Sequence, residues 1–473
     1  MYLYFGIESL DKILSNALVG GSILVIAGHP ASGKTLLAST ICMHNALKDH
    51  KCIYISFLED KLRYFSRMKK LGLDLESVEK RGLMKFYEVP LIINERFISD
   101  LIDGVISKAI DEFGPKIVVL DPISPLLRIL HLKAELRALL VNSLVNLARY
   151  MSGLVILVVE VPTNEEKLEL GDIEFIADTV LMLKNVVIKN NLFREIEVRK
   201  SKYSQVTISK MLYSIREGEG LKVYVPPLLA EIPSPDIDKI LRRPCKSLIE
   251  AKVAIHPKEY IYIRTFNLLL IDYILLLSII PVILNDEKIL IISYEIPPDS
   301  LWSTIKEIIE ELSTGINSEA LINKIKDYVT IKGYNPASYL PEQLYYTTLE
   351  LVKEANANTV MFIGEAPLGP IISRDSQILE TYKDLIINHI LSLKKLGQTI
   401  IHVASYETAL KEIIGTLADI TIDVAMPEQK EEHVIRFIRK GKKPITVGDL
   451  VLKDCLDEIS KVLRELNINA SKQ

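Results

Sequence analysis

The chain has 473 residues, of which 49% are hydrophobic and 25% charged, and its formal net charge is -4. This composition is typical of a globular protein and excludes a disordered, fibrous or collagen-like chain. The length predicts two or three domains, and the slightly negative charge provides no overall attraction to DNA or RNA.

In the first half of the chain, short apolar runs typical of strands alternate with longer helical patterns. Apolar strands separated by helices indicate a mostly parallel sheet covered on both faces. A late strand pair and a stiff, proline-rich linker at 226–238 are expected to follow. The expected strands are 23–27, 52–57, 116–120, 154–161, 179–183, 197–201 and 221–225, and the expected helices are 35–48 and 132–151.

Short motifs of the first half recur in the second half, in the same order and at a nearly constant offset. Such recurrence indicates a tandem duplication of one α/β fold. The matching segments are 55–57 with 292–294, 177–178 with 418–419, and 199–202 with 439–442, at offsets of 237, 241 and 240 positions.

One apolar stretch, 266–284, is about as long as a bilayer-spanning helix. It contains Asp272 and Pro281, and a central Asp costs roughly 3 kcal/mol on membrane insertion. With the offset of 237, the stretch falls on the loop and first helix of the second α/β copy, which are buried in such folds. We therefore expect no membrane span.

The cysteines Cys42, Cys52, Cys245 and Cys455 show no C-x-x-C spacing. We expect them to be buried, reduced side chains rather than a disulfide framework or a zinc site. No signal peptide is visible at the N-terminus, so the expected location is the cytoplasm. Abundant Ile, Leu, Lys and Glu indicate a thermophilic, archaeal source.

A phosphate-binding loop is predicted between the first strand and the first helix. The segment 28–35 reads GHPASGKT, which fits the pattern G-x-x-x-x-G-K-[ST] in the strand-to-helix context that the motif requires. Backbone N–H groups and the helix N-terminus would bind phosphate oxygens, and the Thr hydroxyl would bind Mg²⁺. The expected binding residues are Gly28, His29, Pro30, Ala31, Ser32, Gly33, Lys34 and Thr35.

Acidic residues at two strand ends are candidates for the remaining chemistry. Asp121 ends the strand 116–120 and is expected to bind Mg²⁺ together with Thr35. Glu59 and Asp60 follow the second strand, where a carboxylate could orient the attacking water, although both could equally be solvated loop acids. Lys200 and Lys202 lie on one face of a strand, where spacing alone favours an ordinary solvated surface.

Residues 4–225 resemble the KaiC branch of the RecA-like ATPases. The lead-in FGIESLDKIL, the loop GHPASGKT, and then ISFLED, LGLDL, VVLD, ADT and RKSK follow in the order of that family. The resemblance implies a RecA-like core that binds ATP and Mg²⁺ at the subunit interfaces of a ring, commonly of six copies. It also implies that Lys200 and Lys202 reach the nucleotide of a neighbouring subunit.

Two positions depart from the pattern of this family. Leu58 stands where the first of two adjacent glutamates is usual, and Lys202 stands where an arginine is usual. The first glutamate is generally taken as the group that activates water, so ATP binding is expected while hydrolysis is slow or depends on Glu59 alone. Lysine also lacks the planar fork with which arginine binds phosphate.

The second half is predicted to be a degenerate RecA-like domain without a nucleotide site. With the offset of 237, the phosphate loop falls on 265–272 (TFNLLLID), which lacks both glycines, the lysine and the hydroxyl. Gly364 falls at the metal position, with Glu365 beside it. We expect no autokinase activity here; the retained Glu295, Arg439, Lys440 and Lys442 are either inherited surface residues or a basic rim for a partner.

The sequence thus predicts two tandem RecA-like domains, each a mostly parallel sheet flanked by helices. The boundaries are 1–230 for the ATP-binding domain, 231–240 for the linker, 241–447 for the degenerate domain and 448–473 for a helical tail. The main hypothesis is a regulatory KaiC-like ATPase that assembles into a ring and presents its second domain to a protein partner.

Two alternatives stay open. A RecA- or RadA-type protein acting on DNA would need basic loops at the ring centre, but 163–171 carries three Glu and one Lys. Arg128, Lys133 and Arg137 leave some room for nucleic acid. A non-hydrolysing switch, in which ATP binding alone drives assembly, is favoured by Leu58.

Overall fold

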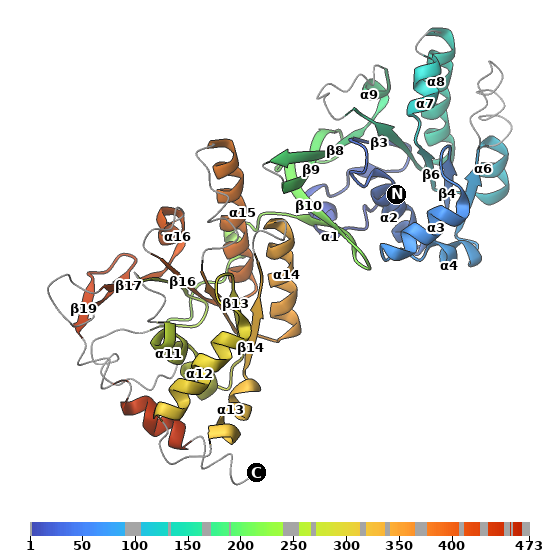
Figure 1. Ribbon diagram of the computed structural model, residues 1–473. Coiled ribbons are helices and arrows are strands. Elements are labelled where there is room, and N and C mark those ends of the chain that lie inside the picture. Colours follow the sequence, from blue (N-terminus) through green and yellow to red (C-terminus); the bar gives the residue numbers. More distant parts are fainter. Residues whose placement is uncertain are drawn as a thin grey trace. The chain divides into compact units, whose positions relative to one another are not determined.

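The computed structural model divides into two compact units, Met1–Val225 and Pro226–Gln473, here called the first and the second unit (Figure 1). Each unit has its own sheet and its own hydrophobic core. The residues described are 2–89, 106–130, 134–162, 172–188, 191–239, 255–265, 271–312, 318–335, 341–364, 376–405, 411–425, 434–448, 455 and 457–465.

The first unit contains a nine-stranded sheet in the order β11-β10-β9-β8-β3-β7-β6-β4-β5. Strands β3 to β8 pair in parallel, and β9, β10 and β11 extend the sheet in antiparallel fashion. The strands are β3 (Ser22–Gly28), β4 (Cys52–Ser56), β5 (Met84–Glu88), β6 (Ile117–Asp121), β7 (Leu154–Glu160), β8 (Thr179–Ile188), β9 (Asn191–Ser201), β10 (Lys210–Arg216) and β11 (Gly220–Tyr224). A separate pair is β1 (Tyr2–Leu3) with β2 (Leu18–Val19).

Helices cover both faces of this sheet, as the apolar strands predict. Side chains alternate along β3, so that Leu24 and Ile26 belong to one core while Ile23 and Val25 belong to the other. The first core also contains residues of α1 (Glu8–Ile13), α2 (Lys34–Ala46), α3 (Lys61–Lys70) and α4 (Leu75–Lys80). The second contains residues of α6 (Lys108–Phe113), α7 (Ser124–Leu130) and α8 (Ala134–Met151), and α9 (Asp172–Ile176) precedes β8.

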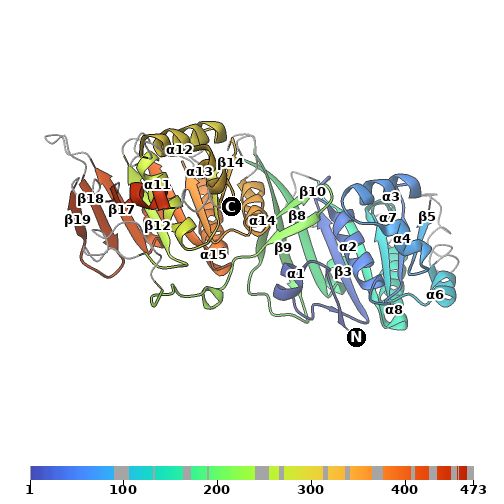
Figure 2. The ribbon, with the colours of Figure 1, turned by 90° about the horizontal axis from the view of Figure 1, so that it is seen from below.

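The second unit repeats this topology with one strand fewer, in the order β14-β13-β15-β16-β12-β17-β18-β19. Figure 2 shows β12, β17, β18 and β19 following one another toward one edge. The strands are β12 (Tyr260–Thr265), β13 (Ile289–Ser293), β14 (Val329–Gly333), β15 (Thr359–Ile363), β16 (Thr399–Ser405), β17 (Ile420–Ala425), β18 (Val434–Arg439) and β19 (Ile445–Gly448). The helices are α11 (Ile271–Leu284), α12 (Pro298–Leu312), α13 (Ser318–Lys326), α14 (Pro341–Glu354), α15 (Ser376–Lys395) and α16 (Lys411–Leu417), and a 3-10 turn, η2 (Leu229–Glu231), begins the unit.

The matching strand orders confirm the predicted fold class of two tandem α/β sheets flanked by helices. A hydrogen bond that occurs in both units shows which residues of β3 and β12 are equivalent. The Asp178 carboxylate accepts from the backbone N–H of Ile23 at 2.9 Å, and Asp419 accepts from Tyr260, 237 positions after Ile23, at 2.8 Å.

The offset of 240 predicted for the basic motif is wrong. Ser201 pairs with Thr179 in the first unit, and Arg439 pairs with Ile420 in the second. The backbone N–H of Lys202 donates to the backbone oxygen of Asp178, and that of Lys440 donates to the backbone oxygen of Asp419. Lys440 therefore corresponds to Lys202. A register shift in the β8–β9 ladder, which the β17–β18 ladder lacks, adds one residue to β9 and accounts for one of the two positions of misalignment.

The equivalence predicted for Gly364 is also wrong by one residue. Ser56 at the end of β4 pairs with Asp121, whereas Ser293 at the end of β13 pairs with Ile363. The second unit therefore carries a buried isoleucine at the position of Asp121. The apolar side chain of this isoleucine supplies no oxygen ligand for a metal ion.

The apolar stretch that suggested a membrane span contains α11, as the repeat predicts. Buried residues of this helix, among them Leu275 and Ile279, belong to the core of the second unit. Residues 266–270 lie outside the described residues. Among the helices that the structure describes, none is long and apolar enough to cross a bilayer.

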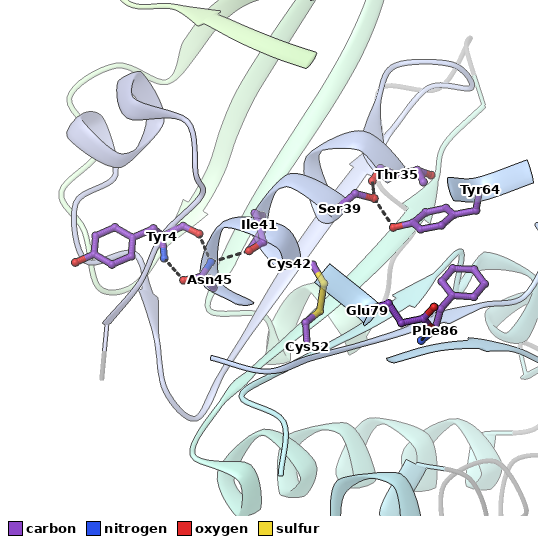
Figure 3. The surroundings of a disulfide bond; sticks show 10 residues. All are labelled: Tyr4, Thr35, Ser39, Ile41, Cys42, Asn45, Cys52, Tyr64, Glu79 and Phe86. Carbon is purple, nitrogen blue, oxygen red and sulfur yellow. Dashed lines mark hydrogen bonds between the residues drawn. A yellow bond between two sulfur atoms is a disulfide. The ribbon is translucent and has the colours of Figure 1, made fainter. Parts of the chain in front are cut away.

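A disulfide joins Cys42 on α2 to Cys52 on β4 (Figure 3), so the expectation of reduced cysteines is wrong at these positions. It is also wrong for Cys455, which is disulfide-bonded, and Cys245 lies outside the described residues. The absence of C-x-x-C spacing did not reveal this disulfide because the two cysteines lie on different elements, a helix and the strand that follows it.

Removing this disulfide is expected to destabilise the first unit by about 3 kcal/mol, the loss predicted for a closed loop of about ten residues. We would compare urea unfolding of the Cys42→Ala/Cys52→Ala variant with that of the wild-type chain, both without reductant. Because Cys455 is also disulfide-bonded, adding reductant to the variant then measures how much the remaining disulfide contributes to stability. Equal unfolding midpoints for the two unreduced proteins would contradict the prediction.

Candidate functional site

A cavity of about 380 Å³ opens at the carboxyl ends of the parallel strands in the first unit. In open α/β sheets, ligands bind at this edge, and the volume is within the range of small-molecule sites. The lining residues come from the β3–α2 loop, α2, β4, α3, the ends of β6 and β7, and β10. They are Ala31, Gly33, Lys34, Thr35, Leu36, Tyr54, Ser56, Leu58, Glu59, Tyr64, Arg67, Met68, Leu71, Asp121, Pro122, Glu160 and Ile215.

The loop between β3 and α2 has a conformation that depends on its glycines. Gly33 caps α2 in the left-handed region with a φ of 89°, and a Cβ there would lie 2.6 Å from Ile215 Cδ1. A Cβ on Gly28 would lie 2.3 Å from the backbone oxygen of Leu183. These positions therefore exclude larger residues, and the loop directs the N-terminus of α2 toward the cavity.

Lys34 lies in the first turn of α2, and its side chain is buried. Its Nζ donates to the backbone oxygen of His29 at 2.8 Å. Burial lowers the pKa of Lys34, while the negative charges of Glu160 and Asp121 oppose this shift. The ammonium group thus lies in an acidic cavity, where an anionic ligand would compete with the His29 oxygen for it.

A second buried polar atom of the loop is the Ser32 hydroxyl. It has no hydrogen-bond partner among the residues that the structure describes. His29, by contrast, is fixed by Asn185, whose backbone N–H donates to its Nδ1 at 3.1 Å. A buried hydroxyl without a partner is unfavourable, and an oxygen-rich ligand would satisfy it.

Asp121 ends β6 and is buried beside the loop. Its Oδ2 accepts from the hydroxyl of Tyr54 at 2.5 Å, and the Thr35 side chain also hydrogen-bonds to this carboxyl group. Burial raises the pKa of Asp121, against the lowering effects of these hydrogen bonds and of Lys34. Thr35 and Asp121, predicted separately from the sequence, therefore lie together and offer the hard oxygen atoms that Mg²⁺ prefers.

Glu59 also lines the cavity, but its carboxylate is bound within the chain. Its Oε2 lies 2.5 Å from a terminal nitrogen of Arg67 on α3. Burial raises the pKa of Glu59, and the positive charge of Arg67 opposes this shift. Asp60 caps α3 by accepting from the backbone N–H of Arg63, so its role in this structure is that of a helix cap.

The lining residues that the sequence did not predict include Arg67, Tyr54 and Glu160. Arg67 stands in the middle of an ordinary charged helix, and Tyr54 stands inside an apolar strand. Glu160 ends β7, as Asp121 ends β6, and this shared position at a strand end was the one available signal.

Lys200 and Lys202 do not line the cavity. Lys200 Nζ donates to the backbone oxygen of Glu174 at 2.8 Å, and Lys202 Nζ contacts Asp178 Oδ1 at 2.9 Å. Burial lowers the pKa of Lys200, and the positive charge of Lys202 adds to this shift. Within one copy of the chain, these lysines and Lys34 do not meet.

The acidic segment 163–171, Glu365, and residues 266–270 lie outside the described residues, as do the side chains of Arg128, Lys133 and Arg137. In the part of the chain that is described, no group of three or more His, Cys, Asp or Glu residues could hold a metal ion.

At the carboxyl edge of the second sheet, charged side chains are paired with one another. Arg264 makes two hydrogen bonds to the Asp423 carboxylate, at 2.6 and 2.8 Å. Glu295 packs against Gly364, where a Cβ would lie 2.6 Å from its carboxyl carbon. These contacts are typical of residues that stabilise the fold, and they differ from the phosphate loop at the same edge of the first sheet.

Comparison with known proteins finds a match over the part of the chain that contains this cavity. Residues 3–227 match the family model of the KaiC ATPase. The circadian clock oscillator protein KaiC of Picosynechococcus sp. is 26% identical over 215 residues, which are 45% of this chain and 41% of that relative. The circadian clock protein KaiC3 of Synechocystis sp. is 24% identical over 232 residues, 46% of this chain and 44% of the relative. The chain therefore spans less than half the length of these curated relatives.

Proposed function

The first unit of this chain is a KaiC-like ATPase domain. From this match we propose that the protein binds and hydrolyses ATP and has a regulatory role. ATP and Mg²⁺ would bind in the cavity of the first unit. The observation that carries the proposal is the convergence of the glycine loop, Lys34, Thr35 and Asp121 on one cavity.

The residues present fit a nucleotide with its metal ion. Backbone N–H groups of the loop and the Lys34 ammonium would bind the phosphates, and the unpartnered Ser32 hydroxyl is a further donor. Thr35 and Asp121 would hold Mg²⁺, which neutralises phosphate charge when bound. Met68 and Ile215, which also line the cavity, offer apolar contact to the rest of the nucleotide.

We further propose that copies of the chain assemble head to tail into a ring, with six as the expected number. Lys200 and Lys202 would then exchange their present contacts for the nucleotide of a neighbouring copy. Exposed apolar side chains support an interface on both sides. Leu62 lies on α3, a helix that also contributes residues to the cavity, and is 82% exposed. Phe175, whose backbone oxygen accepts a hydrogen bond from Lys200, is 80% exposed.

A second candidate function is an assembly switch that binds ATP without useful turnover. Two residues in the loop that follows β4 favour this function. Leu58 carries no carboxylate, and Glu59 is bound by Arg67. In both candidates the second unit binds no nucleotide and serves as a docking surface for a protein partner.

The decisive experiment measures particle mass and nucleotide content together. Mass photometry of the wild-type chain with and without ATP and Mg²⁺ should report a ring that forms or tightens with nucleotide. Filter binding of labelled ATP should saturate at one nucleotide per chain. Two nucleotides per chain would contradict the degenerate second unit, and no saturable binding would refute the proposal.

Charge placed on the proposed interface should prevent assembly. Phe175→Glu is expected to shift the mass distribution to single chains and to lower turnover at least about tenfold, because a desolvated carboxylate opposes association. Leu229→Glu is the matched control, since Leu229 is 77% exposed but belongs to the second unit. Equal ring formation by both variants would place the interface elsewhere.

A further inference from the structure

Strand order brings an acid that the sequence motifs do not mark to the first glycine of the phosphate loop. Strand β7 lies between β3 and β6, and Glu160 is the partner of Gly28 in the β3–β7 ladder. The backbone on both sides of Glu160 is fixed. Its own N–H donates to Ser124 Oγ at 2.6 Å, and the N–H of Val161 donates to the Gly28 oxygen at 2.9 Å.

The Glu160 carboxylate lines the cavity and is not bound to another side chain. Among the residues that the structure describes, it forms no ion pair and no hydrogen bond, and its side chain is exposed to the cavity. Its negative charge raises the pKa of Lys34, which lines the same cavity, more than that of Asp121 does. A free carboxylate thus faces the place where the terminal phosphate of a nucleotide held by Lys34 would lie.

The other candidate acids are less suited to activate water. Leu58 is apolar and 64% exposed, and the Glu59 carboxylate is held by Arg67. Asp121 is buried and is bound by Tyr54 and Thr35. A carboxylate that accepts a proton from water needs a free oxygen on the side of the attacked phosphate.

We propose that Glu160, rather than Glu59, orients and deprotonates the attacking water during ATP hydrolysis. The proposal rests on the proposed function of the first unit. The water oxygen forms a bond to the γ-phosphorus as the bond to the β,γ-bridging oxygen breaks. The electron pair of that bond leaves with ADP, and the water proton passes to the Glu160 carboxylate, which returns it to solvent after phosphate is released.

Single-turnover hydrolysis of ATP by the full-length chain tests this assignment, with Glu160→Gln and Glu59→Gln as a matched pair. Glu160→Gln is expected to lower the rate at least about 100-fold, within the ~10²–10⁴ range of general-base catalysis. Glu59→Gln should lower it less than about tenfold. A larger loss in Glu59→Gln, or wild-type rates in Glu160→Gln, would overturn the proposal.

Nucleotide affinity provides a readout that a merely structural role would not produce. Removing a negative charge beside the terminal phosphate should leave ATP binding by Glu160→Gln unchanged or up to about tenfold tighter, with no gain for ADP. Weaker ATP binding by this variant would overturn the proposal. If the wild-type chain binds ATP without hydrolysing it, the assignment fails while the proposed binding function stands; if it binds no ATP, both fail.

Discussion

Replacing Lys34 with alanine is expected to weaken ATP binding at least about 100-fold. The cavity contains the positive charges of Lys34 and Arg67 and the negative charges of Glu59, Asp121 and Glu160. Arg67 is paired with Glu59 at 2.5 Å, so Lys34 is the main cation opposing the other two acids. Without it, an incoming triphosphate loses a charge-assisted hydrogen bond and meets two carboxylates that no cation offsets.

Isothermal titration with ATP and Mg²⁺ measures this loss directly, since a 100-fold change in Kd corresponds to about 2.7 kcal/mol. Lys34→Arg is an informative companion because it keeps the charge but does not fit a buried site made for a compact ammonium. Lys200→Ala is the control, and in dilute single chains it should bind ATP as the wild type does. Equal affinity in Lys34→Ala and wild type would refute the proposed site.

The sequence predicted most of the first unit because its signals are local. A buried parallel strand is a continuous apolar run, and a phosphate loop needs its glycines and lysine within eight positions. The proximity of Thr35 and Asp121, the proposed metal ligands, could be predicted because each lies at or after the end of a recognisable strand. Strand order then brought the two residues together, as the parallel topology requires.

What the sequence did not predict depends on contacts between distant elements. Glu160 ends an apolar strand of Leu, Val and Ile residues, and only the position of β7 beside β3 brings it to Gly28. Arg67 is one of several basic residues on α3, and its contact with Glu59 distinguishes it from the rest. The offset of 240 for the basic motif failed partly for the same reason, since the β8–β9 register shift has no local signature.

The core of the second unit contains polar aromatic side chains at positions where the first unit has apolar ones. In the first unit Val25 pairs with Leu157, and at the equivalent positions Tyr262 pairs with His402. His402 is 3% exposed; its Nδ1 lies 3.2 Å from the Tyr260 hydroxyl and its Nε2 lies 3.2 Å from the Gly364 oxygen. The ring of Phe362 packs against His402 and against His389.

Acid is therefore expected to unfold the second unit well before it affects a core of apolar residues. Burial lowers the pKa of His402 to about 4, and burial together with His402 lowers the pKa of His389 to about 3. An unfolded histidine has a pKa near 6.5, so the unfolded chain binds more protons between pH 6.5 and 4. Stability is then full above pH 6.5 and falls as the pH drops through this window, by about 3 kcal/mol for His402 alone.

Urea unfolding of the full chain at pH 7 and at pH 4.5, followed by fluorescence of Trp302 in the second unit, measures this effect. His402→Gln keeps a polar side chain beside Tyr260 but does not titrate in this range, so its unfolding free energy should depend less on pH. His256→Gln is the control, because the side chain of His256 contacts the Lys239 oxygen at the surface of the same unit. If His402→Gln and wild type lose equal stability on acidification, another group carries the proton linkage, and the buried histidine is not what makes this core sensitive to acid.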